Sequence, residues 1–242
     1  MSKTLCLDFG NTRLKTALFE NGELKEILVL KEDPLRHLEQ IIGQYKPSSS
    51  ILSSVVNHDF QIERLLISST KFHKLNNESQ LPFTIPVGKP ETVGADRLAI
   101  AAASVYLFPN RNNLVIGLGS CITYNFINQF NELIGGAISP GMEMRFKAMH
   151  QFTAKLPLVS TDWNVPLIGY DTRTNLQTGV VLGMAKEIDG MIEAYAEKFG
   201  NFNAVLTGGD IAILQPHLKS KIFADPDLIF KGLYAISQIN HA

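Results

Sequence analysis

The second half of this sequence repeats the pattern of the first, and this repeat constrains the fold more than any other feature. When the two halves are superposed, Leu5–Asn11 falls on Leu114–Ser120, and Glu23-Leu24 falls on Glu132-Leu133 without a gap. Identities are few, but both copies show an apolar strand, a glycine-containing turn, a second strand, another turn and a third strand. Either two strand meanders are alike by chance, or one supersecondary unit has been duplicated. Duplication predicts two domains of the same kind.

Hydrophobic periodicity and turn residues predict the elements of each half. Asn21-Gly22 is a hairpin signal between two strands, and the helix over 96–107 is rich in alanine, so we expect it to pack closely. The predicted strands include 3–8, 14–20, 23–30, 49–56, 83–87 and 203–207, and the predicted helices are 34–45, 59–69, 96–107, 141–155, 173–199 and 228–239. This order indicates an α/β protein with domains 1–110 and 111–242 and a cleft between them.

Composition and charge exclude several classes of protein. With 45% hydrophobic residues among 242, the chain can bury a full core and is not disordered. A net charge of −1 gives no reason to expect a nucleic acid or an anionic membrane as partner. Cys6 and Cys121 fit neither a disulfide framework nor a cysteine metal site. The run Leu5–Leu7 is too short for a signal peptide, and 98–108 is too short to span a bilayer.

The first candidate site is the turn that follows the first strand. Asp8 ends a buried strand, Gly10 follows in a tight turn, and Lys15 comes shortly after. Such a turn lets backbone N–H groups face a phosphate while the carboxylate holds a divalent cation. The same residues also suit an ordinary hairpin in which Asp8 and Asn11 satisfy the turn geometry. The segment is not a P-loop, because no Gly-x-x-x-x-Gly-Lys-Ser/Thr occurs in the chain.

The second candidate site is Gly94-Ala95-Asp96-Arg97, which opens the alanine-rich helix. A helix start suits a polar ligand, because free N–H groups and the positive end of the helix dipole lie there. Asp96 would accept a proton from a substrate hydroxyl. Plain helix capping is the alternative, but capping does not explain why Arg97 precedes a run as apolar as Leu-Ala-Ile-Ala-Ala-Ala. We favour the functional interpretation.

Further glycine-rich turns lie in the second half. Gly117-Leu118-Gly119-Ser120 is the repeat partner of Asp8–Asn11; its glycines allow close approach to phosphate, and Ser120 offers a hydroxyl. Thr207-Gly208-Gly209-Asp210 follows a strand, where glycine would let a nucleotide ring lie on the backbone. Thr172 is either a helix cap or a ligand contact. Taken singly, each of these segments is more often a turn than a site. The histidines show no ligand spacing, and no Gly-x-Ser-x-Gly supports serine hydrolysis.

In order and spacing these segments resemble the type III pantothenate kinases of the sugar kinase, heat-shock protein and actin superfamily. DFGNTRLK resembles the first phosphate motif, VGADR the substrate and base motif, and VIGLGSCITYN the second phosphate motif. GGAISPGMEM, TAKLP, GYDT, LTGGD and DPDLIFKGL resemble later segments, so the resemblance covers nearly the whole chain. It implies two duplicated ribonuclease-H-like domains with an interdomain cleft, as in actin-like ATPases. It also implies a cytoplasmic homodimer that phosphorylates pantothenate to 4′-phosphopantothenate with ATP and Mg²⁺, the first step of coenzyme A synthesis.

The resemblance also implies roles for individual residues. The ATP-binding residues would be Asp8, Phe9, Gly10, Asn11, Thr12, Arg13, Leu14, Lys15 and Ser120. The pantothenate-binding residues would be Val87, Gly94, Ala95, Asp96, Arg97 and Thr172. Asp96 would be the general base, and Asp8 would approach Mg²⁺ through a water molecule. Phosphoryl transfer depends mostly on positioning and charge stabilisation, so two glycine turns, one acid beside the metal and one base are sufficient.

Two positions depart from the family pattern. The family usually has an aspartate that holds a monovalent cation, K⁺ or NH₄⁺, where this chain has Gly117, which argues against a requirement for that cation. Val87 stands where a substrate-contacting tyrosine is often found, whereas Ser120 replaces a threonine but keeps the hydroxyl. Two alternatives are a catalytically weak relative acting as a nucleotide-sensing regulatory protein, and a kinase for another small metabolite. A sensor needs no base, yet both Asp8 and Asp96 are present.

The predicted helix over 141–155 carries Met142, Phe146, Met149 and Phe152 at helical spacing. This apolar stripe fits either pairing of two chains or packing inside one chain, and the sequence does not separate the two.

Overall fold

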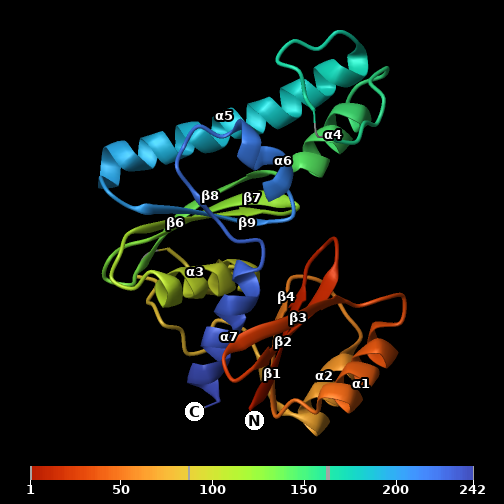
Figure 1. The fold of residues 1–242 in the computed structure, drawn as a ribbon, viewed down its shortest axis with the longest axis vertical. Coiled ribbons are helices and arrows are strands. Elements are labelled where there is room, and N and C mark those ends of the chain that lie inside the picture. The colour runs from red at the N-terminus through yellow and green to blue at the C-terminus, as the bar shows by residue number, and fades with distance from the viewer. Residues whose placement is uncertain (1, 87, 162–163, 242) are drawn as a thin grey trace. The chain divides into compact units, whose positions relative to one another are not determined.

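The computed structural model describes residues 2–86, 88–161 and 164–241, and in this part of the chain the strands form two five-stranded sheets. The order is β3-β2-β1-β4-β5 in the first sheet and β10-β9-β6-β7-β8 in the second. Read from β8, the second order repeats the first, with β6 in the place of β1. β4 is parallel to β1, and β9 is parallel to β6. The predicted duplication in an α/β fold is therefore confirmed (Figure 1).

The elements lie close to their predicted positions. The first half contains β1 (Lys3–Phe9), β2 (Leu14–Glu20), β3 (Glu23–Val29), α1 (Pro34–Tyr45), β4 (Ser49–Ser54), α2 (Phe60–Ser69), β5 (Lys71–Lys74), the 3-10 helix η1 (Pro90–Thr92) and α3 (Ala95–Leu107). The second half contains β6 (Asn113–Leu118), β7 (Cys121–Ile127), β8 (Leu133–Pro140), α4 (Met142–Gln151), α5 (Thr172–Phe199), β9 (Asn203–Gly208), α6 (Ile211–Leu214), η2 (Gln215–His217), β10 (Phe223–Ala224) and α7 (Leu228–Asn240). Asn21 and Gly22 both have positive φ, as the hairpin signal requires.

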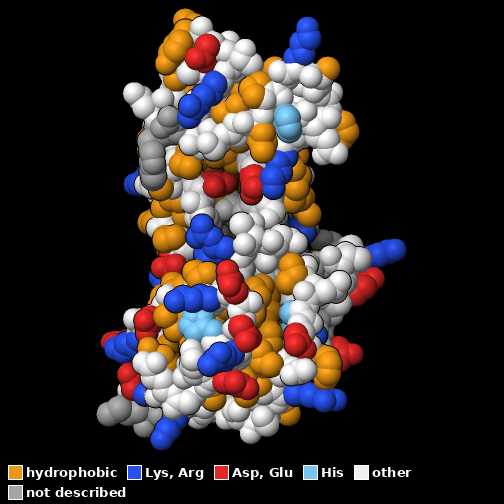
Figure 2. Space-filling model, turned by 90° about the vertical axis from the view of Figure 1, so that its right-hand side faces the viewer, with side chains coloured by type: hydrophobic (Ala, Val, Ile, Leu, Met, Phe, Trp, Pro, Cys, Tyr) orange, Lys and Arg blue, Asp and Glu red, His pale blue; other side chains and the backbone are white. Residues whose placement is uncertain are grey.

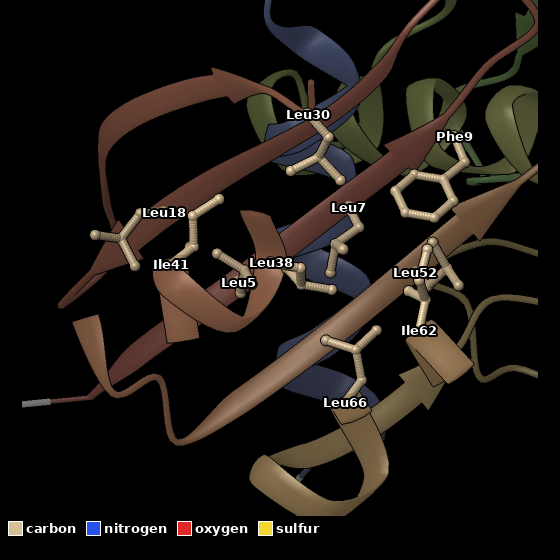
Figure 3. Close-up of a cluster of buried hydrophobic side chains, with 10 residues drawn as sticks. All are labelled: Leu5, Leu7, Phe9, Leu18, Leu30, Leu38, Ile41, Leu52, Ile62 and Leu66. Atoms are coloured by element: carbon tan, nitrogen blue, oxygen red, sulfur yellow. The ribbon is translucent and has the colours of Figure 1, made fainter. Parts of the chain in front are cut away.

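The first sheet separates an apolar face from the face that carries Asp8. Side chains alternate along a strand, so Leu5, Leu7 and Phe9 of β1 point to the same side. They pack in one buried cluster, drawn in Figure 3, with side chains of β2, β4, α1 and α2 and with Leu30; the other members are Leu18, Leu30, Leu38, Ile41, Leu52, Ile62 and Leu66. Asp8, between Leu7 and Phe9, consequently lies on the opposite face.

Helices α3 and α7 pack against each other, and both contact strands of the first sheet. Phe19 of β2 stacks on Tyr234 of α7, with ring centroids 4.5 Å apart. A Cβ atom on Gly232 of α7 would lie 1.8 Å from the carbonyl oxygen of Ala99, so the two helix backbones meet there. The run Ala101–Ala103 is fully buried. The close packing predicted from the alanine content is therefore confirmed, and it fixes the start of α3.

In the second sheet the side chains of β7 contact α5, which lies across the strands in Figure 1. Phe126 stacks on Phe199 with centroids 4.1 Å apart, and the Tyr124 hydroxyl donates to Glu187 over 3.1 Å. Asp171 caps the start of α5: its carboxylate accepts from the Thr174 N–H at 2.7 Å.

The chain divides into two compact units that differ from the predicted domains. Unit 1 contains Met1–Asn110, Ile127–Ile134 and Asp227–Ala242, and unit 2 contains Arg111–Phe126 and Gly135–Pro226. We expected 111–242 to form the second domain. The C-terminal segment groups with unit 1 because α7 packs against α3, β1 and β4.

Three local predictions need correction. Of the predicted strand 83–87, residues 83–86 are described; they form no strand, and Thr84 makes only an isolated bridge to Glu132. A strand that was not predicted, β5, has only four residues, KFHK, and lacks an apolar run. Helix α4 ends at Gln151 rather than at 155, and Phe152 beyond it is 80% exposed, so no burial favours a longer helix.

Among the described residues, no helix is both long enough and apolar enough to cross a bilayer. Basic and acidic side chains are interspersed on the face shown in Figure 2, in keeping with the net charge of −1.

Candidate active site

The turn between β1 and β2 is tight and solvent-facing. The Gly10 N–H donates to the Arg13 carbonyl over 3.2 Å, and Asn11, Thr12 and Arg13 are exposed. A hollow of about 380 Å³ opens beside it, and its lining residues come from the turn, the end of β3 and the segment after β4: Gly10, Asn11, Thr12, Arg13, Leu14, Val29, Leu30, Lys31 and Val56. Two of the lining side chains, Arg13 and Lys31, are cationic. This arrangement suits an anionic ligand at the turn.

Asp8 and Lys15 are neighbours across the first two strands. They are register partners of the antiparallel β1–β2 pair, so their side chains share one face of the sheet. Asp96, at the start of α3, is close enough to act on the Asp8 carboxylate. Burial first, and then the like charge of Asp96, raise the pKa of Asp8 to about 6, against an opposing effect of Lys15. Unit 1 therefore brings together two carboxylates and a lysine, a combination typical of functional sites.

Asp96 does not serve as the N-terminal cap of α3. Gly94 occupies the cap position and makes no side-chain cap bond. The Asp96 carboxylate accepts from the Arg97 N–H at 2.9 Å and folds back over Gly94. A Cβ on Gly94 would lie 2.6 Å from Asp96 Oδ1, so the absence of a side chain at 94 is what makes room for this carboxylate. Asp96 is therefore not the N-cap residue, although its bond to the Arg97 N–H satisfies one free donor of the first turn.

Two residues predicted to bind ATP have their side chains in the core. Phe9 is fully buried in the cluster of Figure 3 and meets the His58 ring edge-on at 5.3 Å. Leu14 packs against the same cluster. Only the backbone of Phe9 is available to a ligand at the turn, whereas Leu14 is partly exposed and also lines the hollow.

The second-half turn is held by close backbone contacts. The Gly141 N–H donates to the Ser120 carbonyl over 3.1 Å, and the Gly209 N–H donates to the Leu118 carbonyl over the same distance. A Cβ on Gly141 would lie 2.3 Å from the Gly119 carbonyl oxygen, and one on Gly208 would lie 2.1 Å from that of Leu118. Glycines from two other loops therefore pack directly on this turn.

The remaining predicted residues are placed as follows. Gly117 is the next-to-last residue of β6, and Ser120 is partly exposed in the turn that follows. Ala95 and Arg97 are partly exposed in the first turn of α3. Thr172 is exposed and is not the cap of α5, because Asp171 fills that position. Val87 lies outside the described residues.

Our sequence analysis missed Ser53, a buried hydroxyl in register with Asp8. Its importance depends on the pairing of β1 with β4, which no local pattern in the sequence reveals. Asp210 is a second case: burial first, and then Glu143, raise its pKa. In the sequence Asp210 is part of a glycine turn, and nothing there indicates that Glu143 lies close enough to act on it.

The residues around Asp8 fit a hydrated magnesium ion. Among the described residues, no three His, Cys, Asp or Glu side chains form a group that could hold a metal. Mg²⁺ commonly binds one or two carboxylates, keeps several waters and takes its other ligands from substrate phosphates. Asp8, its neighbour Asp96 and the unpaired hydroxyl of Ser53 match that pattern.

Comparison with known proteins finds one family over nearly the whole chain. The family model for type III pantothenate kinase matches residues 4–194. A type III pantothenate kinase from Christiangramia forsetii is 40% identical over 98% of this chain and 98% of its own length. Proteins of the same name from Flavobacterium johnsoniae and Bacteroides fragilis are each 37% identical, covering 95% of both chains in the first case and 98% in the second.

Solved structures show the same fold at low sequence identity. A protein assigned to the Baf family of transcriptional activators from Campylobacter jejuni is 22% identical, with a TM-score of 0.61 over 98% of both chains. A glucokinase from an Antarctic psychrotroph is 11% identical, with a TM-score of 0.51 over 99% of both chains. The chain therefore shares its overall fold with these two proteins. The extent of the sequence match decides the family, and the chain belongs to the type III pantothenate kinases.

Proposed function

We propose that this protein transfers the γ-phosphoryl group of ATP to pantothenate, giving 4′-phosphopantothenate in the first step of coenzyme A synthesis. The single observation that carries the proposal is the Asp8–Asp96 pair, which unit 1 assembles beside Lys15 and the exposed glycine turn. A phosphotransferase needs one acid near the metal and one near the acceptor hydroxyl. The two carboxylates come from different elements, β1 and α3.

Asp96 is the general base in this proposal. Its carboxylate takes the proton of the pantothenate hydroxyl as that oxygen attacks phosphorus, and the bond to the ADP oxygen breaks. Gly94 has no side chain, so it leaves room for the Asp96 carboxylate in its observed position. Ala95 and Arg97, at the same helix start, contact pantothenate. Thr172 and Val87 are the further pantothenate contacts that we propose.

The ATP phosphates are bound by the turn after β1. Backbone N–H groups of Asn11–Arg13 face them, and Lys15 with Arg13 offsets their charge. Asp8 would hold Mg²⁺ through a water molecule, and the ion would neutralise charge on the transferred phosphoryl group. Ser120 is the ATP contact that we propose in unit 2, where Gly141 supports its carbonyl.

We also propose that the protein is a cytoplasmic homodimer. The support is a group of exposed apolar side chains in and after α4 and before α5: Met144, Phe152, Leu158, Leu167, Ile168 and Tyr170. Met142 and Phe146, two members of the predicted stripe, are instead buried. Light scattering should give about twice the chain mass of 26.8 kDa; a mass near 26.8 kDa would contradict the dimer.

The purified protein with ATP, MgCl₂ and pantothenate tests the activity. ADP release should depend on pantothenate, and mass spectrometry should identify 4′-phosphopantothenate. Glucose and other small hydroxyl compounds, supplied in place of pantothenate, test the alternative of another metabolite kinase. Nucleotide binding with no turnover on any acceptor would favour the regulatory alternative and would contradict the proposal.

A further inference from the structure

Two hydroxyl groups are buried in the first sheet without a hydrogen-bond partner among the described residues. They belong to Thr16 and Ser53, each 1% exposed. A buried hydroxyl has lost its bonds to water, so leaving it unpaired is unfavourable and calls for an explanation. The two residues lie in different positions relative to the candidate site, and this difference points to a role for one of them.

Ser53 lies beside Asp8. In the parallel pairing of β1 with β4, Asp8 is the register partner of Ser53, and on the other side Asp8 pairs with Lys15 of β2. Register partners on adjacent strands point their side chains to the same face. Lys15, Asp8 and Ser53 therefore form a row across three strands, on the face opposite the cluster of Figure 3.

Thr16 pairs with Leu7 instead and lies on the other face, with the apolar cluster. Its unpaired hydroxyl is buried on the face opposite Asp8. Thr16 is therefore the matched control for Ser53.

The other serines of β4 all have partners. The Ser49 hydroxyl bonds to the Thr4 hydroxyl at 2.9 Å, and the Ser50 hydroxyl bonds to the Thr70 hydroxyl at 2.6 Å. The Ser54 hydroxyl donates to the Val56 carbonyl over 2.9 Å. Within this strand only Ser53, at the position next to Asp8, is left unpaired.

We propose that Ser53 is a further metal-site residue, whose hydroxyl binds a water of the hydrated Mg²⁺ that accompanies the nucleotide. This inference rests on the proposed function. A serine hydroxyl can accept one hydrogen bond and donate another. It accepts a hydrogen bond from the metal-bound water beside the Asp8 carboxylate, so both residues of the row hold the hydration shell. Water-mediated contact suits Mg²⁺, which gives up its waters reluctantly.

The test compares Ser53→Ala with Thr16→Val, because each removes a buried unpaired hydroxyl and little else. Binding of ADP is measured by calorimetry in MgCl₂ and in EDTA, and the melting temperature is recorded without ligand. Both variants should melt at or above the wild-type temperature. Only Ser53→Ala should weaken ADP binding in MgCl₂, by about tenfold, as expected for a lost hydrogen bond to a charged group. In EDTA its affinity should equal that of wild type.

Each other outcome overturns the proposal. Wild-type Mg²⁺ dependence in Ser53→Ala would show that the hydroxyl has no part in binding the ion, and would leave the proposed function intact. Equal weakening in both variants would show a structural role only. If the wild-type protein bound ADP with the same affinity in MgCl₂ and in EDTA, both this inference and the role proposed for Asp8 would be overturned. The Ser53→Thr variant, which keeps the hydroxyl, should bind ADP in MgCl₂ more tightly than Ser53→Ala.

Discussion

The two turns related by the internal repeat share a position in the fold and differ in chemistry. Near the end of β1, the chain presents Asp8, with Lys15 and Asp96 acting on its carboxylate. At the end of β6 and in the turn that follows, the corresponding residues Gly117–Ser120 carry no charge. The backbone of Gly141, Gly208 and Gly209 packs closely against this second turn.

This difference shows what a duplication preserves. The strand order and the parallel pairing of the central strands are the same in both sheets. These features depend on apolar burial and backbone hydrogen bonds, which tolerate many sequences. A charged site depends on a few side chains. One copy can therefore keep those side chains while the corresponding turn of the other copy has only uncharged residues. The following predictions, from the largest expected effect to the smallest, test that division.

Asp96→Asn should lower kcat by about 10²–10⁴-fold, because it removes the proposed general base, which lies at the start of α3 near Asp8. The amide is nearly isosteric, so ADP affinity and melting temperature should stay near wild type. Steady-state kinetics with ADP calorimetry makes the comparison. A variant that kept more than about a tenth of wild-type kcat would remove Asp96 from this role.

Asp8→Asn should stabilise the ligand-free protein at pH 7.5 by about 3 kcal/mol. Burial and Asp96 raise the pKa of Asp8 to about 6, above its ordinary value of 3.8. The folded protein then holds this proton more tightly than the unfolded chain does. The ionised carboxylate therefore destabilises the fold above about pH 6, and this penalty disappears as the pH falls from 6 towards 4.

Urea unfolding at pH 4, 5.5 and 7.5, without metal or nucleotide, measures this effect. The gain should be absent at pH 4 and complete at pH 7.5. Asp210→Asn, in unit 2, should show a gain of the same sign, because burial and Glu143 raise the pKa of Asp210 as well. An Asp8→Asn gain that is equal at all three pH values would show that charge is not its cause.

Gly94→Ala should lower kcat by about tenfold without unfolding the protein, since a small displacement of a catalytic group is costly. The backbone at Gly94 has φ −60° and ψ 145°, which alanine adopts freely. The new methyl group would meet Asp96 Oδ1 at 2.6 Å and push the carboxylate aside. Gly43→Ala is the control, because a Cβ there meets nothing within 4 Å. Unchanged kcat in Gly94→Ala would mean that the observed carboxylate position is not the productive one.

Gly117→Asp should convert the neutral turn into a partly charged one. Wild-type kcat/KM should differ by less than about twofold between KCl, NaCl and a bulky-cation chloride at equal ionic strength, because the turn has no carboxylate for the ion. The variant should prefer KCl by a few-fold. A preference of about tenfold for K⁺ in the unmodified protein would show that other oxygens rebuild the cation site.

Local patterns predicted most of the scaffold. The Asn-Gly hairpin, the helix beginning at Pro34 and the alanine-rich helix were located within a few residues, because turn chemistry and apolar spacing act over short distances. The repeat predicted two similar domains, and the shared strand order confirms it. β5 was missed because its pairing with β4, rather than its own composition, makes it a strand.

The sequence by itself determined that the chain is a duplicated α/β protein, that Asp8 ends a strand at a glycine turn, and that Asp96 opens an alanine-rich helix. Only the tertiary structure decided that Asp96 lies close enough to act on the Asp8 carboxylate, that Ser53 lies in register with Asp8, and that α7 returns to pack on α3 and β1. The reason is physical: spacing along a chain fixes turns and helix faces, whereas strand pairing and helix packing join residues distant in sequence. The proposed chemistry depends on those distant partners.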